Sequence, residues 1–242
     1  MKGGNRAAAW VLVLLTPLIA EIAFGSTPLR MAWLVLLWLW LPIYGAGILL
    51  VRESVRRTGR GWPSILLLGL AYELVEDGIG LQALSSPHLY HAANWGAGIF
   101  GLNLPYWELN AIYHIIFSAM IPIFLTDLMF PAYRYLPYLK KTGFVITAIV
   151  ALLGVGLLRV AVPPSQDPGY TAPWFITFGC VVGVIILAVI ALRILPPANR
   201  RSLMAGGFWH RWLPQQPSPS SPIGWYSAGR DQRNLPTWTH SR

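Results

Sequence analysis

Six long apolar runs constrain what this chain can fold into. They cover residues 8–24, 31–51, 63–83, 107–129, 143–163 and 173–195. A helix needs about 20 apolar residues to cross a bilayer, and each run has that length or nearly so. The runs also lack the alternation of membrane β-strands. The sequence therefore predicts an all-α fold: a polytopic integral membrane helix bundle, residues 1–195, with six transmembrane helices.

The basic residues indicate how these helices are oriented. Sixteen of the 18 Lys and Arg residues lie at the amino end, in the second and fourth connections or in the tail, and only Arg30 and Arg159 lie elsewhere. Positively charged loops stay in the cytoplasm, so both termini are predicted to be cytoplasmic. We expect these loops to contact anionic lipid of the bilayer. Because the basic residues cluster between apolar runs, the net charge of +9 predicts no nucleic-acid partner.

The two ends of the chain carry separate expectations. Residues 196–242 are rich in Pro, Ser and Arg with isolated Trp, which predicts a disordered, basic cytoplasmic tail. At the other end, Lys2 and Arg6 precede the first apolar run, so residues 1–24 have a second interpretation as a cleaved signal peptide. We favour a retained first helix, because Glu21 is unusual in such a peptide.

The sequence contains none of the common soluble-enzyme motifs in a context that supports their function. The glycines at 96, 98 and 101 spell GxGxxG, but they lie in a predicted outer loop rather than between a strand and a helix. Walker A, CxxC and GxSxG sequences are absent, which leaves nucleotide hydrolysis, thiol redox chemistry and a serine elbow without support. Cys180, the one cysteine, lies in an apolar run, where we expect it to pack.

Acidic residues at membrane depth are the strongest functional signal. A charge there costs several kcal/mol unless it is paired, neutralised or hydrated. Glu108 and Asp127 lie near span ends, where we expect water or headgroups to reach them. Glu73, Glu76 and Asp77 lie deep in the third span and share one face of an ideal α-helix. Their repulsion predicts a proton, a bound cation, or an Arg or His partner.

His114 is the expected partner of these acids. At 1.5 Å per residue, Glu76 lies about 4–5 Å outside the bilayer centre and His114 about 6 Å outside it. Asn110 and Ser118 extend a polar stripe on either side of His114. Adjacent spans usually pack together, so we expect one pocket in the outer half of the membrane.

Three further side chains lie near this level of the membrane. Glu21 occupies the outer part of the first span, and the loop above the pocket contributes His88 and His91. Carboxylates with imidazoles predict a divalent-metal site, such as one for zinc, with Glu73, Glu76, Asp77 and His114 as ligands. The same groups can instead form a proton relay, or a hydrogen-bond cluster that only holds the helices together.

The pair Glu76-Asp77 in a Gly-flanked helix, followed by a helix with His114, resembles the CPBP family of intramembrane metalloproteases, which is related to CAAX prenyl proteases. The family motifs are EExxxR, FxxxH and HxxxN. Here Leu81 stands in place of the Arg, Asn110 in place of the Phe, and a second intramembrane His is missing. The resemblance implies that Glu76 is a general base, His114 a metal ligand, and Asp77 a second ligand or orienting group.

A second resemblance covers more of the chain. The stretch from LLTP in the first span to GRGWPSILLLGLAYE in the third is similar to uncharacterised bacterial multispan proteins. It implies a location in the bacterial cytoplasmic membrane and no particular activity. Three functions stay open: a metal-dependent membrane hydrolase, a proton-coupled transporter or channel subunit, and a non-catalytic membrane component.

Overall fold

The computed structural model describes residues 5–23 and 36–198. Within these ranges every regular element is a helix, and strand pairing is limited to one bridge between Ile99 and Leu102. The predicted all-α fold is therefore confirmed. The expected disordered tail lies outside the described residues beyond Ala198.

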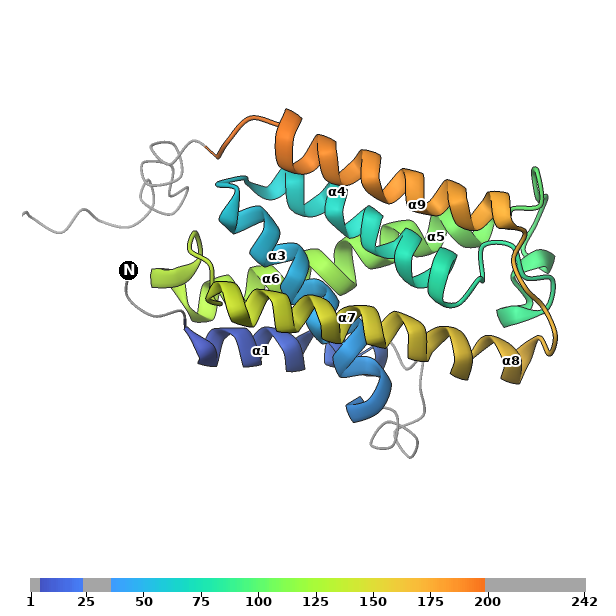
Figure 1. Cartoon of the computed structure of the whole chain (residues 1–242), viewed down its shortest axis with the longest axis horizontal. Coiled ribbons are helices and arrows are strands. Elements are labelled where there is room, and N and C mark those ends of the chain that lie inside the picture. The colour runs from blue at the N-terminus through green and yellow to red at the C-terminus, as the bar shows by residue number, and fades with distance from the viewer. Residues whose placement is uncertain (1–4, 24–35, 199–242) are drawn as a thin grey trace, which may run out of the picture. The chain divides into compact units, whose positions relative to one another are not determined.

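The described helices join end to end into six tracks that follow the six apolar runs (Figure 1). The tracks are α1 (Arg6–Pro17) with η1 (Leu18–Ile22); η2 (Leu36–Ala46) with α3 (Gly47–Arg57); α4 (Trp62–Glu73) with η3 (Leu74–Gly80); α5 (Leu104–Tyr113) with η5 (His114–Met120) and α6 (Ile121–Met129); α7 (Lys141–Ala161) with α8 (Pro163–Gln166); and α9 (Trp174–Val189) with η7 (Ile190–Ile194). Two short 3-10 helices, η4 (Leu89–Asn94) and η6 (Pro131–Tyr133), lie in the connections.

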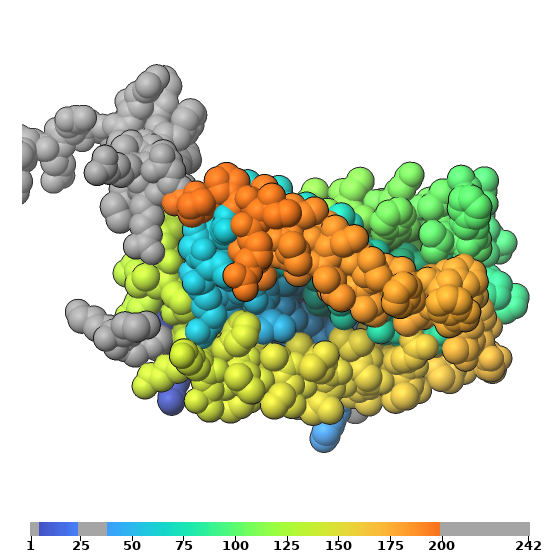
Figure 2. Space-filling model, turned by 45° about the horizontal axis from the view of Figure 1, so that its top comes forward, coloured from blue at the N-terminus to red at the C-terminus, as the bar shows by residue number. Residues whose placement is uncertain are grey.

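Three of these tracks are long and apolar enough to cross a membrane: Leu104–Met129, Lys141–Gln166 and Trp174–Ile194. Their outward faces are correspondingly apolar, with Leu152 71% exposed and Phe178 61% exposed. In a soluble protein such surfaces would drive association, whereas lipid accepts them. In Figure 2, α7 and α9 form two ridges with other helices visible in the hollow between them. The structure thus agrees with a membrane protein, and the full set of six spans stays a prediction.

Several tracks contain wide, π-helical turns. In these turns an N–H bonds the carbonyl five residues back, as Leu81 N does with Glu76 O at 2.7 Å. The segments η3 and η5, which carry the acids and His114, are both of this kind. Such turns are rare and often mark functional sites. They also change which residues share a helix face.

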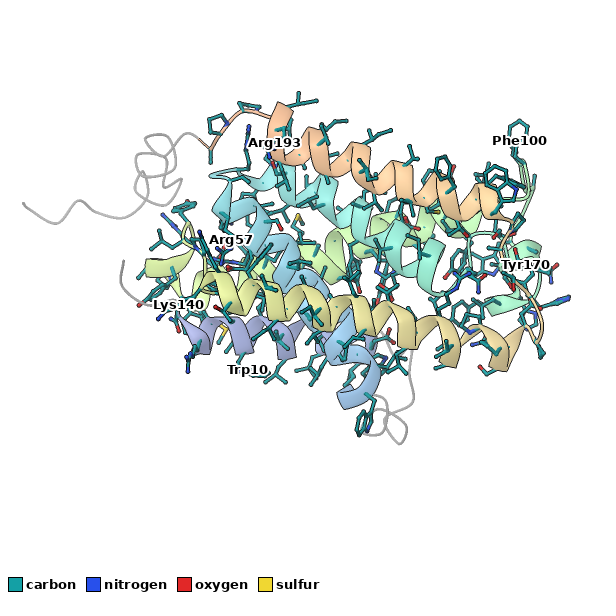
Figure 3. The ribbon with its side chains drawn as sticks, viewed as in Figure 1. Trp10, Arg57, Phe100, Lys140, Tyr170 and Arg193 are labelled. Atoms are coloured by element: carbon teal, nitrogen blue, oxygen red, sulfur yellow. The ribbon has the colours of Figure 1, made fainter. Side chains whose placement is uncertain are left out.

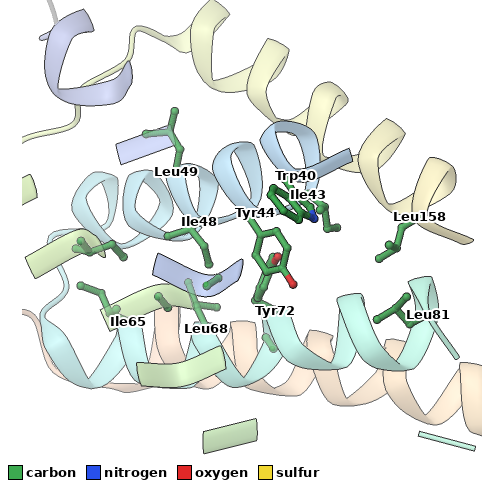
Figure 4. Packing of buried hydrophobic residues seen from close by; sticks show 14 of the residues in the cluster. Trp40, Ile43, Tyr44, Ile48, Leu49, Ile65, Leu68, Tyr72, Leu81 and Leu158 are labelled. Atoms are coloured by element: carbon green, nitrogen blue, oxygen red, sulfur yellow. The ribbon is translucent and has the colours of Figure 1, made fainter. Parts of the chain in front are cut away.

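The core is apolar and forms where the tracks cross. Figure 4 shows Trp40 and Ile43 of η2, Ile48 of α3 and Ile65 and Leu68 of α4 packed together. Close approach is possible because small residues lie at the crossings. A Cβ added at Gly69 of α4 would lie 3.2 Å from the Cα of Ile115 and 3.3 Å from the Cβ of Ala119. The helix with the acids is therefore held directly against the helix with His114.

One end of the bundle holds a buried ion network. Arg52 is fully buried and donates to Asp127 Oδ1 from Nε at 3.1 Å and from Nη2 at 2.8 Å. Arg56 donates to Asp127 Oδ2 at 2.9 Å, and Tyr138 donates to Asp127 Oδ1 at 3.0 Å. The expectation that water or headgroups reach Asp127 is therefore wrong: the carboxylate is only 7% exposed and is neutralised by two guanidinium groups.

The same network ties down the connection between α6 and α7. Glu53 is fully buried and accepts from the backbone N–H groups of Tyr138 at 2.6 Å and Leu139 at 3.2 Å. The guanidinium of Arg52 also lies 3.3 Å from the centre of the Tyr138 ring. These contacts explain why α3 continues to Arg57, beyond the end of the apolar run at residue 51. Figure 3 shows Arg57 and Lys140 at this end of the bundle and Phe100 and Tyr170 at the other.

Candidate intramembrane acid–histidine site

The structure brings Glu76, Asp77 and His114 together. His114 Nδ1 lies 3.4 Å from Glu76 Oε2, and His114 Nε2 lies 3.7 Å from Asp77 Oδ2. The three residues are between 1% and 3% exposed. The imidazole therefore stands between two carboxyl groups, with a different one facing each ring nitrogen.

Of the two polar side chains predicted beside His114, Ser118 and Asn110, only Ser118 contacts the imidazole. Ser118 Oγ lies 3.0 Å from His114 Nδ1, as the predicted polar stripe requires. Asn110 instead donates its side-chain N–H to Tyr106 O at 2.9 Å within its own helix. The stripe is therefore shorter than predicted, and Asn110 does not contribute to the group.

Aromatic rings enclose the imidazole. The ring centre of Tyr113 lies 5.6 Å from that of His114, Tyr72 lies at 5.7 Å and Tyr44 at 6.3 Å. These rings come from α5, α4 and η2, so three tracks build the wall. Figure 4 shows Tyr44 and Tyr72 facing each other in the buried core. Tyrosines are a suitable wall for acids and an imidazole, since each ring excludes water and carries one hydroxyl.

Glu73 is separated from this group by its own partner. The carboxyl is fully buried, and its Oε2 accepts from Trp107 Nε1 at 3.0 Å. The prediction that Glu73, Glu76 and Asp77 act as one cluster on His114 therefore needs correction at Glu73. The indole of Trp107, which the sequence analysis does not single out, donates a hydrogen bond to one of the two carboxyl oxygens of Glu73.

Several carboxyl oxygens in this region are buried and incompletely bonded. Within the described part of the chain, Glu73 Oε1, Glu76 Oε2 and Asp77 Oδ2 have no hydrogen-bond partner. Buried polar atoms are nearly always hydrogen-bonded, so each exception calls for an explanation. Two of these atoms, Glu76 Oε2 and Asp77 Oδ2, are the ones that face His114.

The side of the group that faces the loop between η3 and α5 is closed by an aromatic cover. Tyr106 donates its hydroxyl to Asp77 Oδ1 at 3.3 Å. Its ring stacks on Tyr90, with centres 6.3 Å apart, and meets the edge of Trp95 at 5.3 Å. Tyr90 is 41% exposed, so the chain of contacts reaches the surface of the protein. Partial burial, and then the charge of Asp77, raise the pKa of the Tyr90 phenol.

The loop that supplies this cover is anchored by polar contacts. Ser86 Oγ donates to Asp167 Oδ2 at 2.6 Å, and Asn103 donates to the carbonyls of Ala83 and Ser86, both at 2.9 Å. His88 and His91 belong to this loop, but their side chains are exposed and do not reach the acids. The loop also contains Gly101 at φ +78°, so glycine there serves a turn. This supports the rejection of a dinucleotide motif.

Two other charged residues lie at the edge of the site. Arg159 donates to Ile79 O at 2.5 Å, so it bonds the end of η3 rather than an acid side chain. Glu21 lies on η1, which packs on η5, and it interacts electrostatically with Glu76. Tyr113 links the same elements, because its hydroxyl donates to Ala20 O.

The metal-ligand set of Glu73, Glu76, Asp77 and His114 stays a prediction. In residues 5–23 and 36–198, no three or more His, Cys, Asp or Glu side chains are grouped so that they could hold a metal ion. Glu73 turns to Trp107 and Glu108 is exposed, which leaves Glu76, Asp77 and His114 as a linear series. Such a series can pass protons between neighbouring groups.

Comparison with known proteins supports the membrane assignment. The model of an uncharacterized membrane protein family matches residues 10–203, which is most of the chain. The search of curated proteins and the search of solved structures gave no match. These comparisons do not show the resemblance to CPBP metalloproteases.

Proposed function

We propose that this chain, which belongs to the uncharacterized membrane protein family that matches residues 10–203, is a proton-carrying, multi-pass protein of the bacterial cytoplasmic membrane. Its carrier is the relay Glu76–His114–Asp77, in the outer half of a six-span bundle with both termini in the cytoplasm. Proton-coupled transport is the activity that this relay serves.

Two observations support the topology. The six helical tracks coincide with the six apolar runs, and three of the tracks satisfy the length and composition of a span by themselves. The buried network of Arg52, Arg56 and Asp127 lies at the end rich in basic residues, which the positive-inside rule assigns to the cytoplasm. The relay is then closer to the outer surface.

The placement of one imidazole between two carboxyl groups carries the proposal. A neutral imidazole accepts a proton at one nitrogen and releases another from the opposite nitrogen. Glu76 can therefore give a proton to Nδ1 while Nε2 gives one to Asp77, and the ring returns to neutral in its other tautomer. The present separations of 3.4 and 3.7 Å must shorten to about 2.6–3.2 Å for transfer.

The outer end of the relay has a route to the surface. The Tyr106 hydroxyl bonds Asp77, and the ring of Tyr106 stacks on the partly exposed Tyr90. A hydroxyl both donates and accepts, so Tyr106 can take a proton from Asp77 while it releases its own to water beside the partly exposed Tyr90, and it stays neutral. Asp77 is thus the outward end of the relay and Glu76 the inward end.

Infrared spectroscopy tests the relay in the full chain reconstituted in vesicles. Protonated carboxyl groups absorb apart from carboxylates, so a pH titration should show buried acids gaining protons. We expect Glu76→Gln and Asp77→Asn each to remove part of that signal, and His114→Gln to shift what remains. Glu108→Gln, which changes an exposed acid on α5, should leave the signal as in the wild type. An unchanged signal in both relay variants would contradict the proposal.

Proton flux tests the transport function. Vesicles with a potassium diffusion potential and an internal pH dye should acidify faster with the wild-type protein than without protein. Glu76→Gln and Asp77→Asn should reduce the rate at least about tenfold, the loss typical for a positioned proton-transfer group. Flux equal to that of protein-free vesicles in the wild type would overturn transport, even if the infrared result supports the relay.

The metal-dependent hydrolase is the second candidate for the same residues. One observation favours it: the unbonded oxygens of Glu73, Glu76 and Asp77 are of a kind that binds cations. A divalent ion such as zinc, held with His114, would supply an activated water. Stoichiometric metal in the purified protein, lost on chelation and in Glu76→Gln, would favour the hydrolase over the relay. If metal and proton exchange are both absent, the cluster only holds helices together.

A further inference from the structure

A groove on the lipid-facing side of the bundle lies apart from the acid–histidine site. It has a volume of about 530 Å³, within the range of small-molecule sites, and lies between α1, the η2–α3 track and α7. Its walls are almost entirely apolar and include Val13, Pro42, Ile146 and Val150. Arg6, at the first turn of α1, is the one charged residue among the described residues of its lining.

The groove has a polar end and an apolar body. Arg6 is exposed where α1 begins, and the exposed Lys140 and Lys141 adjoin Leu139 and Gly143 of the lining. Figure 3 shows Lys140 at this end and Trp10 projecting outward from α1. Among the described lining residues Thr147 alone carries a hydroxyl, which already donates to Gly143 O at 2.8 Å. The body of the groove therefore offers no free hydroxyl donor to a polar ligand.

We propose that this groove binds an anionic phospholipid, with an acyl chain along Trp10 and Ile146 and the phosphate at Arg6. A guanidinium recognises phosphate oxygens through paired hydrogen bonds, and lysines at the membrane surface add attraction for a negative headgroup. By the predicted orientation the lipid belongs to the cytoplasmic leaflet. The site is separate from the proton relay and does not depend on it.

Two positions on α7 allow a matched test. Gly143 lines the groove, and a leucine there would fill space that the acyl chain needs. Gly156 lies on the same helix, and a Cβ added to it meets nothing within 4 Å, so Gly156→Leu adds the same bulk elsewhere. Trp10 is 63% exposed and lines the groove, which makes it a reporter of bound lipid.

The experiment uses the full chain in phosphatidylcholine vesicles that contain a small fraction of brominated lipid, since bromine quenches nearby indoles. The contribution of Trp10 is the difference between the wild type and Trp10→Phe. Brominated phosphatidylglycerol should quench it at lower mole fraction than brominated phosphatidylcholine. Arg6→Gln should weaken this preference about fivefold, which corresponds to about 1 kcal/mol per basic residue.

The remaining variants separate the outcomes. Gly143→Leu should abolish quenching of Trp10 by both lipids, whereas Gly156→Leu should behave as the wild type. Equal quenching by both lipids in the wild type would overturn the preference for anionic lipid and leave an ordinary lipid-facing surface. Absence of quenching by either lipid would show that a protein segment covers the groove and would also overturn the proposal.

Discussion

The carboxyl groups of Asp127 and Asp77 lie in the same domain but meet different partners. Asp127 faces two guanidinium groups, and arginine stays charged under all ordinary conditions. Asp77 faces a tyrosine hydroxyl and an imidazole, both of which can be neutral. Asp127 is therefore paired with fixed positive charges, whereas Asp77 faces groups with which it exchanges a proton in the proposed relay. Because of this contrast we assign a structural role to Asp127 and a proton-transfer role to Asp77.

The Asp127 network should be sensitive to removal of the acid. Asp127→Ala removes the acid that the buried Arg56 pairs with and leaves Arg52 with Glu53, 3.6 Å away, so we expect a loss of about 3–5 kcal/mol in the free energy of unfolding. Denaturant unfolding in detergent, followed by circular dichroism, measures the loss. Lys141→Gln, which removes an exposed charge at the same end of the bundle, should change stability by less than about 0.5 kcal/mol. Equal effects of the two changes would argue against a buried ion pair.

The contact between Glu76 and His114 should appear as energetic coupling. Residues in one network give double-mutant coupling energies of about 0.5–3 kcal/mol. We expect Glu76→Gln and His114→Ala to be non-additive in unfolding free energy, since either change alone disrupts the same contact. Glu108→Gln combined with His114→Ala should be additive, because Glu108 is exposed. Additivity in both pairs would contradict the contact.

At the scale of helices, the crossing of α4 and η5 determines whether the site exists. Gly69 and Ala119 let the two backbones approach, so the acids of η3, about two turns beyond Gly69, reach His114. Gly78 has a similar role on the other side of η3: an added Cβ would lie 2.6 Å from Cys180 Sγ. Cys180 thus packs against η3, as the sequence predicted for a buried packing residue.

Gly69→Ala should loosen this crossing. The added Cβ is closer to Ile115 and Ala119 than an ordinary contact, and overpacking costs about 1–3 kcal/mol. Thermal unfolding of the variant in detergent should therefore occur at lower temperature than in the wild type. Gly156→Ala on α7 places its Cβ in open space and should be neutral or stabilising, because alanine favours helix more than glycine does. A neutral Gly69→Ala would show that the helices can separate without cost.

At the scale of the whole molecule, the predicted orientation places the proposed relay near the outer surface. A Cys180→Ala background removes the native thiol. In that background Asn94→Cys, exposed in the loop between η3 and α5, should react with an impermeant maleimide added to intact cells. Thr58→Cys, exposed between α3 and α4, should react only after permeabilisation. The reverse pattern would invert the bundle and place the relay in the cytoplasmic half.

The sequence by itself determined that the chain is helical, suited to a membrane, and acidic at one level of its third apolar run. These properties are local: the length of an apolar run and the 1.5 Å rise per residue place Glu76 and His114 at similar depth without any knowledge of packing. The structure agrees with that level, since the two side chains lie 3.4 Å apart. The basic run Arg52–Arg60 was predicted to orient the chain and to contact anionic lipid.

Only the tertiary structure decided which partner each charged group meets. Glu73 turns to Trp107, Asp127 to Arg52 and Arg56, and Arg159 to a backbone carbonyl. Each choice depends on how far a helix is rotated about its axis, and the wide turns in η3 and η5 change that rotation. An ideal period of 3.6 residues cannot foresee such turns, because packing between distant segments stabilises them. The depth of a residue in the membrane follows from the local sequence, whereas the direction in which its side chain points follows from the fold.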